Sequence, residues 1–226
     1  MKLTTTKRFS VDTYEHLMQA GKIAPIGIVA IVDRLAYGEG VKRDKRKAFL
    51  IAMSGAKLGS PYLTWYVADA LEHGDGVKKS LLQALQFYKK AIALKGLEAY
   101  TGLGVYFWKK ARSTRDRKKA FAYYKEAIGL YRKAAKKHEP YAILNIGLCY
   151  ANGEGVRVNK KIAYRYFAKS AALGHGDAMF KVGWCLMYGE GVATDAQLAA
   201  HWLEIAADLG HKDARKLLRI VRTKML

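Results

Sequence analysis

The sequence lacks the features that mark several classes of protein. Only 3 of its 226 residues are proline, whereas 51% are hydrophobic, which is enough apolar material for a helical core. No run of about 18 consecutive apolar residues occurs, so no transmembrane helix is predicted. The first residues, Met-Lys-Leu-Thr-Thr-Thr-Lys-Arg, lack the apolar core of a secretory signal. These absences predict a soluble, cytoplasmic protein.

Cysteine is equally scarce, since the chain has only Cys149 and Cys185. They lie 36 residues apart, which is the repeat period described below, so they occupy equivalent places in adjacent units. Packed helices lie roughly 10 Å apart, beyond the ~7 Å that a disulfide allows between Cα atoms. Both thiols are therefore expected to be small buried packing groups, with a metal pair or redox switch as the remote alternative.

Acidic residues are few relative to basic ones. The chain has 40 Lys and Arg against 19 Asp and Glu, which gives a formal net charge of +21. Such an excess favours nucleic acid, an acidic protein or another anionic surface as the partner. It does not indicate a fold.

Groupings of residues that carry chemistry are also missing. The 6 histidines are scattered, without metal-ligand spacing and without a nucleophile beside them. The segment Gly-Glu-Gly-Val lacks the Gly-Lys-Ser/Thr of a P-loop, and no pair of carboxylates suggests an acid/base couple. We therefore expect no catalysis, no cofactor and no metal site.

What the sequence does contain is an internal repeat. The tetrapeptide Gly-x-Gly-Val occurs four times, with a spacing of 36 residues between the first two copies and between the last two, at Gly38–Val41, Gly74–Val77, Gly153–Val156 and Gly189–Val192. The central gap equals two periods plus seven residues, so one unit has lost the signature and gained an insertion. This register predicts a capping helix at 11–25, repeats at 27–62, 63–98, 99–141, 142–177 and 178–213, and a capping helix at 214–226.

The insertion is expected inside the second helix of the third unit. An alanine recurs 21 residues after the start of each unit, at Ala48, Ala84, Ala120, Ala163 and Ala199. The extra residues should therefore follow Ala120, where the heptad 120–126 is followed by a similar heptad, 127–133. Seven residues are close to two helical turns, so the longer helix keeps its apolar face toward the core.

Each unit is predicted to be a helix–turn–helix. In the fourth unit, apolar residues at Ala142, Ile146, Cys149 and Tyr150 follow an i, i+4, i+7, i+8 pattern. Gly147 lies inside this helix, where it costs about 1 kcal/mol relative to Ala, so a close contact with another helix is expected there. The Gly-Glu-Gly turn ends the first helix, and a second helix follows from about 159 to 173. Such units bury their faces only by stacking, which predicts an all-α array.

These motifs resemble the Sel-one-like repeat family, a branch of the tetratricopeptide-like superhelices. The segments 145–150, 153–156 and 161–174 carry the resemblance most clearly, and it covers about residues 24 to 224. It implies a right-handed superhelical solenoid that serves as a scaffold or adaptor for other proteins, often along a concave face lined by first helices. Bacterial members act in signalling and host contact, and some are similar to immunity proteins. The third unit departs from the pattern, because Lys110-Ala-Arg-Ser113 replaces Gly-x-Gly-Val.

The predicted first helices carry no net charge. Together the stretches 27–37, 63–73, 99–109, 142–152 and 178–188 hold three basic and three acidic residues, so a groove lined by them is not a basic channel. By the family's geometry, six of their residues are candidates for a partner-binding concave face: Trp65, Asp69, Trp108, Phe180, Trp184 and Tyr188. For each ring, packing between repeats remains the equal alternative, although Trp and Tyr are common anchors of protein interfaces.

Positive charge is concentrated in the third unit. Residues 109–137 contain 12 Lys and Arg against Asp116 and Glu126, and the predicted basic edge consists of Lys109, Lys110, Arg112, Arg115, Arg117, Lys118 and Lys119. A solvated helix face is one interpretation, and a docking edge for an acidic protein or for phosphates is the other. The sequence thus predicts a non-catalytic scaffold that binds a protein partner, such as an acidic toxin, through the concave aromatic face, the basic edge or both. A nucleic-acid or polyanion binder is the alternative function.

Overall fold

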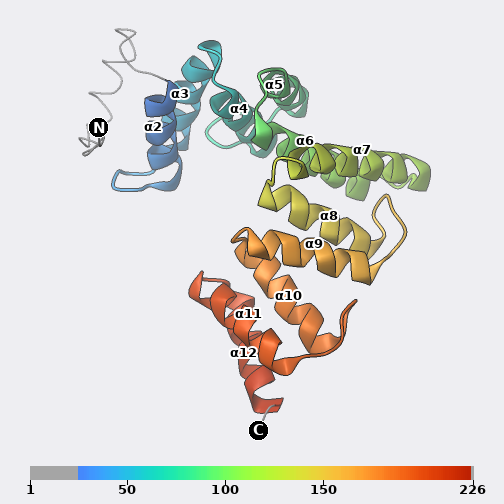
Figure 1. The fold of residues 1–226 in the computed structure, drawn as a ribbon. Coiled ribbons are helices and arrows are strands. Elements are labelled where there is room, and N and C mark those ends of the chain that lie inside the picture. Colours follow the sequence, from blue (N-terminus) through green and yellow to red (C-terminus); the bar gives the residue numbers. More distant parts are fainter. Residues whose placement is uncertain (1–24, 225–226) are drawn as a thin grey trace. The chain divides into compact units, whose positions relative to one another are not determined.

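The computed structural model describes residues 25–224, and these form helices without any strand. In chain order the helices are α2 (Pro25–Tyr37), α3 (Lys45–Lys57), α4 (Pro61–His73), α5 (Leu81–Ala93), α6 (Leu97–Ser113), α7 (Arg117–Ala135), α8 (Pro140–Asn152), α9 (Lys160–Ala172), α10 (Gly176–Tyr188), α11 (Ala196–Asp208) and α12 (Lys212–Lys224) (Figure 1). Apart from Pro25, the predicted capping helix at 11–25 lies outside the described residues. The predicted all-α repeat solenoid is confirmed.

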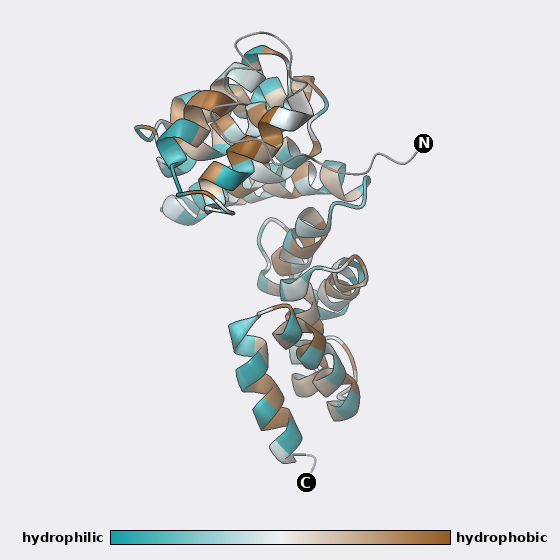
Figure 2. Cartoon of the chain, turned by 90° about the vertical axis from the view of Figure 1, so that its left-hand side faces the viewer, coloured by the Kyte–Doolittle hydropathy of each residue, from teal (hydrophilic) through white to brown (hydrophobic). Residues whose placement is uncertain are grey.

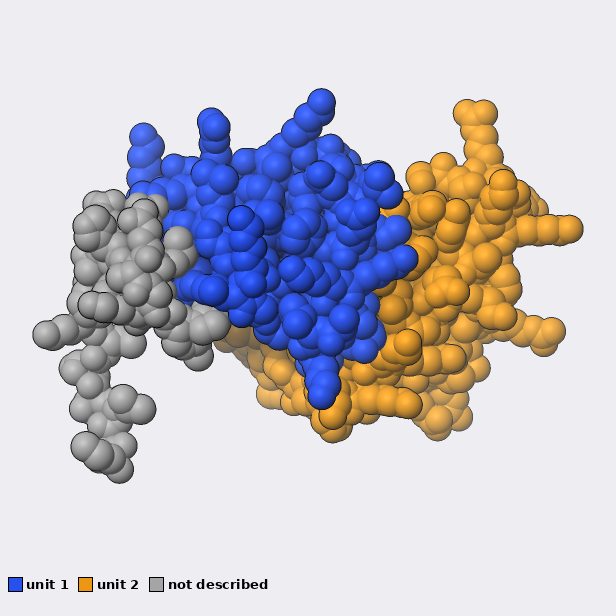
Figure 3. Space-filling view, turned by 90° about the horizontal axis from the view of Figure 1, so that it is seen from above, with its two compact units in different colours: residues 1–102 blue, residues 103–226 orange. Residues whose placement is uncertain are grey.

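The helices belong to two compact units, residues 1–102 (unit 1) and residues 103–226 (unit 2), which Figure 3 colours separately. Within unit 1, helices that follow one another in the chain pack together from α2 to α5, and within unit 2 they do so from α7 to α12. Each helix thus covers the apolar face of its neighbours, which a repeat unit cannot bury by itself.

Local sequence signals fix where the helices begin and end. The second helix of each repeat starts after a side chain that accepts a hydrogen bond from the first turn, at Asp44, Ser80, Asp116, Asn159 and Asp195. Four first helices end at a left-handed glycine, as the Gly-x-Gly turn predicts, at Gly38, Gly74, Gly153 and Gly189. The repeated turn therefore has the same backbone conformation in both units.

Glycines inside the first helices of unit 2 are points of close packing, as predicted for Gly147. A Cβ atom there would lie 2.6 Å from Cε1 of Phe167 on α9. At the equivalent Gly183 it would lie 2.6 Å from Cγ of Leu203 on α11, and at Gly104 it would lie 2.5 Å from a ring carbon of Tyr131 on α7. The missing side chain lets a bulky residue of the second helix reach the backbone of the first.

The register of the insertion differs from the prediction. The residue that packs like the repeated alanines is Ala127, which is 0% exposed, as Ala84 and Ala199 are; Ala120 is only half-buried. The turn glycines agree with this shift, because a Cβ on Gly191 would collide with the backbone of Lys160, the first residue of α9. The equivalent Gly155 instead meets Tyr124 of α7.

The extra residues are therefore the first two turns of α7, residues 117–123, rather than residues after Ala120. α7 is 19 residues long and α6 is 17, whereas the other described helices have 13. The segment Lys110–Ser113, predicted to be an altered turn, continues α6, and only residues 114–116 separate the two helices. The α6–α7 hairpin thus projects past the level at which α8 and α9 of the same unit turn.

The last described helix, α12, covers the end of the unit 2 core. Its buried residues, Ala214, Leu217, Leu218 and Val221, belong to the same apolar cluster as residues of α8 to α11. Its other side is basic and exposed, and Figure 2 shows this helix near the C-terminus with alternating brown and teal segments. One face of α12 is thus packed in the core and the other is exposed.

Candidate functional site

Three of the predicted site residues form a continuous row of rings along α10. The ring centres of Phe180 and Trp184 are 6.2 Å apart, and those of Trp184 and Tyr188 are 4.5 Å apart. Trp184 is 38% exposed and Tyr188 is 46% exposed. We call this row, Phe180–Trp184–Tyr188, the aromatic ladder.

The spacing of the sequence explains why the ladder faces outward. Its residues are four positions apart, so they share one face of the helix. The opposite face of α10 consists of Val182, Cys185 and Leu186, all of which are buried. Because that face is anchored in the core of unit 2, the exposed rings are held on a rigid element rather than on a loop.

Polar groups surround the N-terminal end of the ladder. The imidazole of His211, at the start of α12, stacks on the ring of Phe180 with centres 4.4 Å apart. His211 Nε2 lies 3.5 Å from Oδ1 of Asp177, and the ammonium of Lys181 lies 5.7 Å from the Phe180 ring centre. His211 was not predicted as a site residue, although it has the same repeat position as His175, which contacts Tyr141 edge-on with centres 4.3 Å apart.

Trp108 does not join the ladder. Its indole Nε1 donates a hydrogen bond of 2.8 Å to Oε2 of Glu154, and the guanidinium of Arg112 covers its ring at 4.7 Å. The ring lines an apolar cleft of about 150 Å³ together with Val105, Tyr131, Asn145 and Leu148. Glu154 is the middle residue of its Gly-x-Gly turn. At the same position of other turns, Asp75 forms an ion pair with Lys45 at 2.5 Å and Glu190 forms one with Lys160 at 2.6 Å. In the fourth repeat the hydrogen bond to Trp108 takes the place of this ion pair.

The predicted residues of unit 1 lie in a polar setting instead. Trp65 is half-buried against Tyr62, with ring centres 5.2 Å apart, and its Nε1 has no hydrogen-bond acceptor among the described residues. The Tyr62 hydroxyl donates to Oδ1 of Asp33 at 3.1 Å. Burial raises the pKa of Asp33 by more than this hydrogen bond lowers it, and burial also raises the pKa of Tyr66 to about 12.

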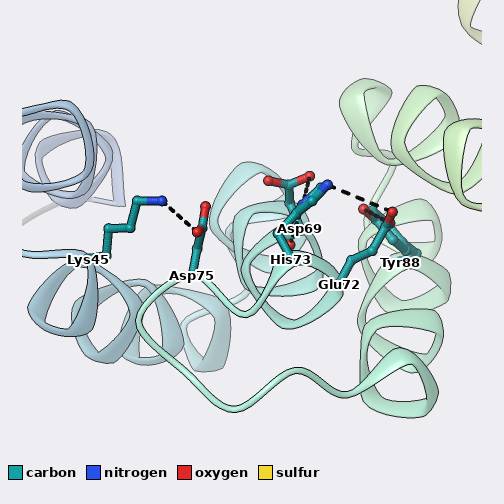
Figure 4. A network of polar contacts seen from close by, with 6 residues as sticks. All are labelled: Lys45, Asp69, Glu72, His73, Asp75 and Tyr88. Carbon is teal, nitrogen blue, oxygen red and sulfur yellow. Dashed lines mark hydrogen bonds and ion pairs between the residues drawn. The ribbon is translucent and has the colours of Figure 1, made fainter.

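Asp69 belongs to a chain of polar contacts along α4 (Figure 4). Its Oδ1 lies 3.4 Å from Nδ1 of His73, and Nε2 of the same imidazole lies 3.9 Å from Oε1 of Glu72. Glu72 is buried, and the hydroxyl of Tyr88 on α5 donates to its Oε2 at 3.0 Å. Burial and the nearby Glu72 carboxylate raise the pKa of Tyr88. A carboxylate in the core was not predicted, because the sequence shows only a polar residue beside a histidine.

The predicted basic edge occupies the projecting end of the α6–α7 hairpin. Its seven cationic side chains are all exposed. Two of them are held over rings, since the Lys110 ammonium lies 4.6 Å from the centre of Tyr123 and Arg112 covers Trp108. The carboxylate of Asp116 accepts hydrogen bonds from the backbone of Lys118 and Lys119. The rings at this end are thus partly covered by the cations that surround them.

Two features of other proteins have no counterpart in the described residues. No group of three or more His, Cys, Asp or Glu side chains is placed to hold a metal ion. Among the helices of residues 25–224, none combines the length and the apolar character that a membrane span needs.

The repeat and the paired helices agree with a known family. The family model of the Sel1 repeat matches residues 30–60, 62–95, 97–128, 124–138, 140–175 and 176–211. The chain belongs to the Sel1 repeat family. Proteins with Sel1 repeats are protein-interaction scaffolds and in general are not enzymes. The overlap of two matched segments at 124–128 falls on the longer helix, α7.

Solved structures of other Sel1 repeat proteins have the same fold. The chain is similar to a Sel1 repeat protein from Oxalobacter formigenes, with 26% identity and a TM-score of 0.72 over 92% of this chain and 88% of that one. It is also similar to a Sel1 repeat protein from Klebsiella pneumoniae, with 22% identity and a TM-score of 0.59 over 93% and 98%. The immunity protein Pa5087 from Pseudomonas aeruginosa has 17% identity and a TM-score of 0.61 over 84% and 67%.

Proposed function

We propose that this Sel1 repeat protein is a non-catalytic scaffold that holds a protein partner against the aromatic ladder of unit 2. The observation that carries the proposal is the exposure of Trp184 and Tyr188 on a helix whose other face is buried. Rigid, partly exposed aromatic rings supply contact area at a small cost in conformational entropy, and Trp and Tyr are enriched among the residues that dominate binding energy.

Charge favours an acidic partner. Lys181 lies beside Phe180, and the basic edge belongs to the same unit. The protein as a whole carries a formal charge of +21, so complementary potential would speed the encounter with an acidic surface. A narrower version of the proposal is an inhibitor or immunity protein for an acidic toxin. Pa5087 is an immunity protein, but at 17% identity it supports only the shared fold.

The test compares equivalent positions in the two units. A partner isolated on the intact protein is titrated against Trp184→Ala, Tyr188→Ala and Tyr37→Ala. Tyr37 is 67% exposed and has the same repeat position in unit 1 as Tyr188 in unit 2. We expect the two ladder variants to weaken binding by about tenfold or more, as truncation of an interface anchor does, and Tyr37→Ala to bind like the wild type. Equal binding by all four proteins would reject the ladder as the contact surface.

The alternative is a polyanion binder that uses the basic edge. Proteins that bind single strands without sequence preference stack bases on open aromatic rings, whereas Tyr123 and Trp108 are covered by Lys110 and Arg112. This difference favours the protein partner. Binding of DNA or RNA at low salt, with an affinity that falls steeply as salt rises, would favour the alternative; an absence of binding under those conditions would remove it.

A further inference from the structure

One glycine inside a helix has no packing role in the described structure. A Cβ atom on Gly129 of α7 would meet nothing within 4 Å, and the residue is exposed. The glycines of the first helices behave differently, because a Cβ on Gly104, Gly147 or Gly183 would clash with a bulky side chain. Glycine is a poor helix former, and no packing among the described residues requires it at 129.

The surroundings of Gly129 are strongly cationic. Its neighbours on the helix surface, three and four positions away, are Lys125, Glu126, Arg132 and Lys133, and each of these is exposed. Ala122, which is also small and exposed, lies two helical turns before Gly129. The outer face of α7 thus has a low centre between charged side chains of which only Glu126 is acidic.

The cations follow the period of a second helix. Lys118, Lys125 and Arg132 are seven residues apart, which places them on one side of the low centre at intervals of about 10.5 Å. Lys119, Glu126 and Lys133 repeat at the same interval on the other side. Arg132 is directed by a hydrogen bond of 3.4 Å from its guanidinium to the hydroxyl of Tyr150. Carboxylates seven residues apart on a partner helix would match the spacing and the charge of Lys118 and Lys125.

We propose that the outer face of α7 docks an acidic helix of a protein partner, packed closely over Gly129 and Ala122. A neighbouring element can approach a helix closely where a residue lacks a side chain, as Phe167 does at Gly147, and carboxylates at the sides would pair with Lys118 and Lys125. The exposed Phe121, which is 50% exposed with the Lys125 ammonium 5.8 Å from its ring centre, extends the contact at one margin.

A helix fits these observations better than nucleic acid or a lipid surface does. Neither a phosphate backbone nor a bilayer requires a residue without a side chain in the middle of the cationic face. Both would be served equally by another lysine at 129. The glycine therefore distinguishes a closely packed partner from diffuse electrostatic adsorption.

This surface is independent of the aromatic ladder on α10. The two surfaces lie on different helices of unit 2 and share no residue. A partner that uses one would leave the other open, so Trp184→Ala should not affect binding at α7. The two proposals can accordingly fail separately.

The experiment uses the full chain and a synthetic three-heptad peptide that forms an amphipathic helix, with Glu at both margins of an Ala- and Leu-containing stripe. An isomer of the same composition, with its Glu residues distributed around the helix, serves as the control peptide. Fluorescence anisotropy at physiological ionic strength should show at least about tenfold tighter binding of the patterned peptide, because both its packing and its charges are complementary.

Two pairs of variants separate packing from charge. Gly129→Leu should retain or raise the melting temperature, since nothing lies within 4 Å of the new Cβ, and should weaken peptide binding by about tenfold or more. Ala172→Leu, at an exposed position of α9, should bind normally. Lys125→Glu should weaken binding more than Lys169→Glu, an equal charge change on α9.

Several results would overturn the proposal. Equal affinity for the two peptides, or equal binding by Gly129→Leu and Ala172→Leu, would show that α7 attracts anions without docking a helix. Duplex DNA or phosphatidylserine vesicles that displace the patterned peptide, in a manner dependent on Lys125, would assign the surface to a polyanion or to a membrane instead.

Discussion

The first helices of the two units present different chemistry at the same repeat positions. Asp69 in unit 1 corresponds to Trp184 in unit 2, and Trp65 corresponds to Phe180. In unit 1 the neighbouring groups are carboxylates and tyrosine hydroxyls, with Tyr62 bonded to Asp33, whereas in unit 2 they are aromatic rings tilted against one another. The repeat therefore specifies the helices and their packing, while the exposed positions of each first helix are free to suit a partner.

The core of unit 1 also contains more polar groups than the core of unit 2. Among the described residues, the buried polar or charged side chains are Ser60, Thr64 and Glu72 in unit 1 and Ser170 in unit 2. A buried polar group is stabilising only while its hydrogen bonds are made. We therefore expect unit 1 to be sensitive to the loss of a hydroxyl and unit 2 to depend on apolar packing.

The largest effect is expected at a contact between a turn glycine and the second helix of the preceding repeat, which occurs once more at the equivalent place in the other unit. Ala at Gly191 would place a Cβ against the backbone of Lys160, at a residue with φ of 80°. The left-handed conformation costs about 1–2 kcal/mol for a residue with a side chain, and the overpacking adds about 1–3 kcal/mol. Gly191→Ala should thus lower the free energy of unfolding by about 3 kcal/mol, measured by urea denaturation.

Two further glycines decide whether packing or backbone strain is responsible. Gly210 has φ of 91° and nothing within 4 Å of a Cβ, so Gly210→Ala should lose only about 1 kcal/mol. Gly76 contacts the backbone of Lys45 in unit 1 as Gly191 contacts Lys160, so Gly76→Ala should resemble Gly191→Ala. A loss at Gly76 no larger than at Gly210 would show that the two contacts are not equivalent.

A smaller effect should distinguish the cores. Tyr88→Phe removes the hydroxyl that donates to the buried carboxylate of Glu72, and an unsatisfied buried group costs about 1–3 kcal/mol. The loss should appear in urea denaturation as earlier unfolding of unit 1, detectable by hydrogen exchange of the α4 and α5 amides. Tyr166→Phe on α9 is the control, since its half-buried ring stacks on Tyr150 and keeps that contact. Equal losses in the two variants would remove the distinction.

Much of the fold could be predicted because the repeat makes the same local signals recur. The Gly-x-Gly turn and the packed glycine of the first helix each depend on contacts within one unit or with the next. The position of the insertion could not be fixed in this way. Two similar heptads place Ala120 and Ala127 on the same helical face, and only the contacts of Gly155 and the burial of Ala127 distinguish them.

The candidate site was harder to predict than the fold. The ladder on α10 follows from a spacing of four residues on one helix, so its members could be found together. Trp108 looked equivalent in the sequence, but its hydrogen bond to Glu154 depends on a turn 46 residues away. His211 was missed for the same reason, because its contact with Phe180 joins two helices whose separation along the chain carries no spacing signal.

The smallest predicted effect concerns the cysteines, both of which lie buried and unpaired in unit 2, as expected. Burial raises the pKa of Cys149 from 9.0 to about 12, and burial raises that of Cys185 to about 11. The folded state therefore holds these protons more tightly than the unfolded state. The resulting stability is fully present below the unfolded pKa and is lost as the pH rises toward the folded values.

At about pH 10 each thiol should lower the free energy of unfolding by about 1 kcal/mol relative to about pH 8, because one pKa unit corresponds to about 1.4 kcal/mol. Half-buried tyrosines such as Tyr66 in unit 1 add to the total loss. Cys149→Ala also changes packing, so the informative quantity is the difference between the two pH values in urea denaturation. That difference should shrink by about 1 kcal/mol in the variant. An unchanged difference would mean that the Cys149 thiol does not contribute to the loss of stability at high pH. The two units would then not differ in this respect.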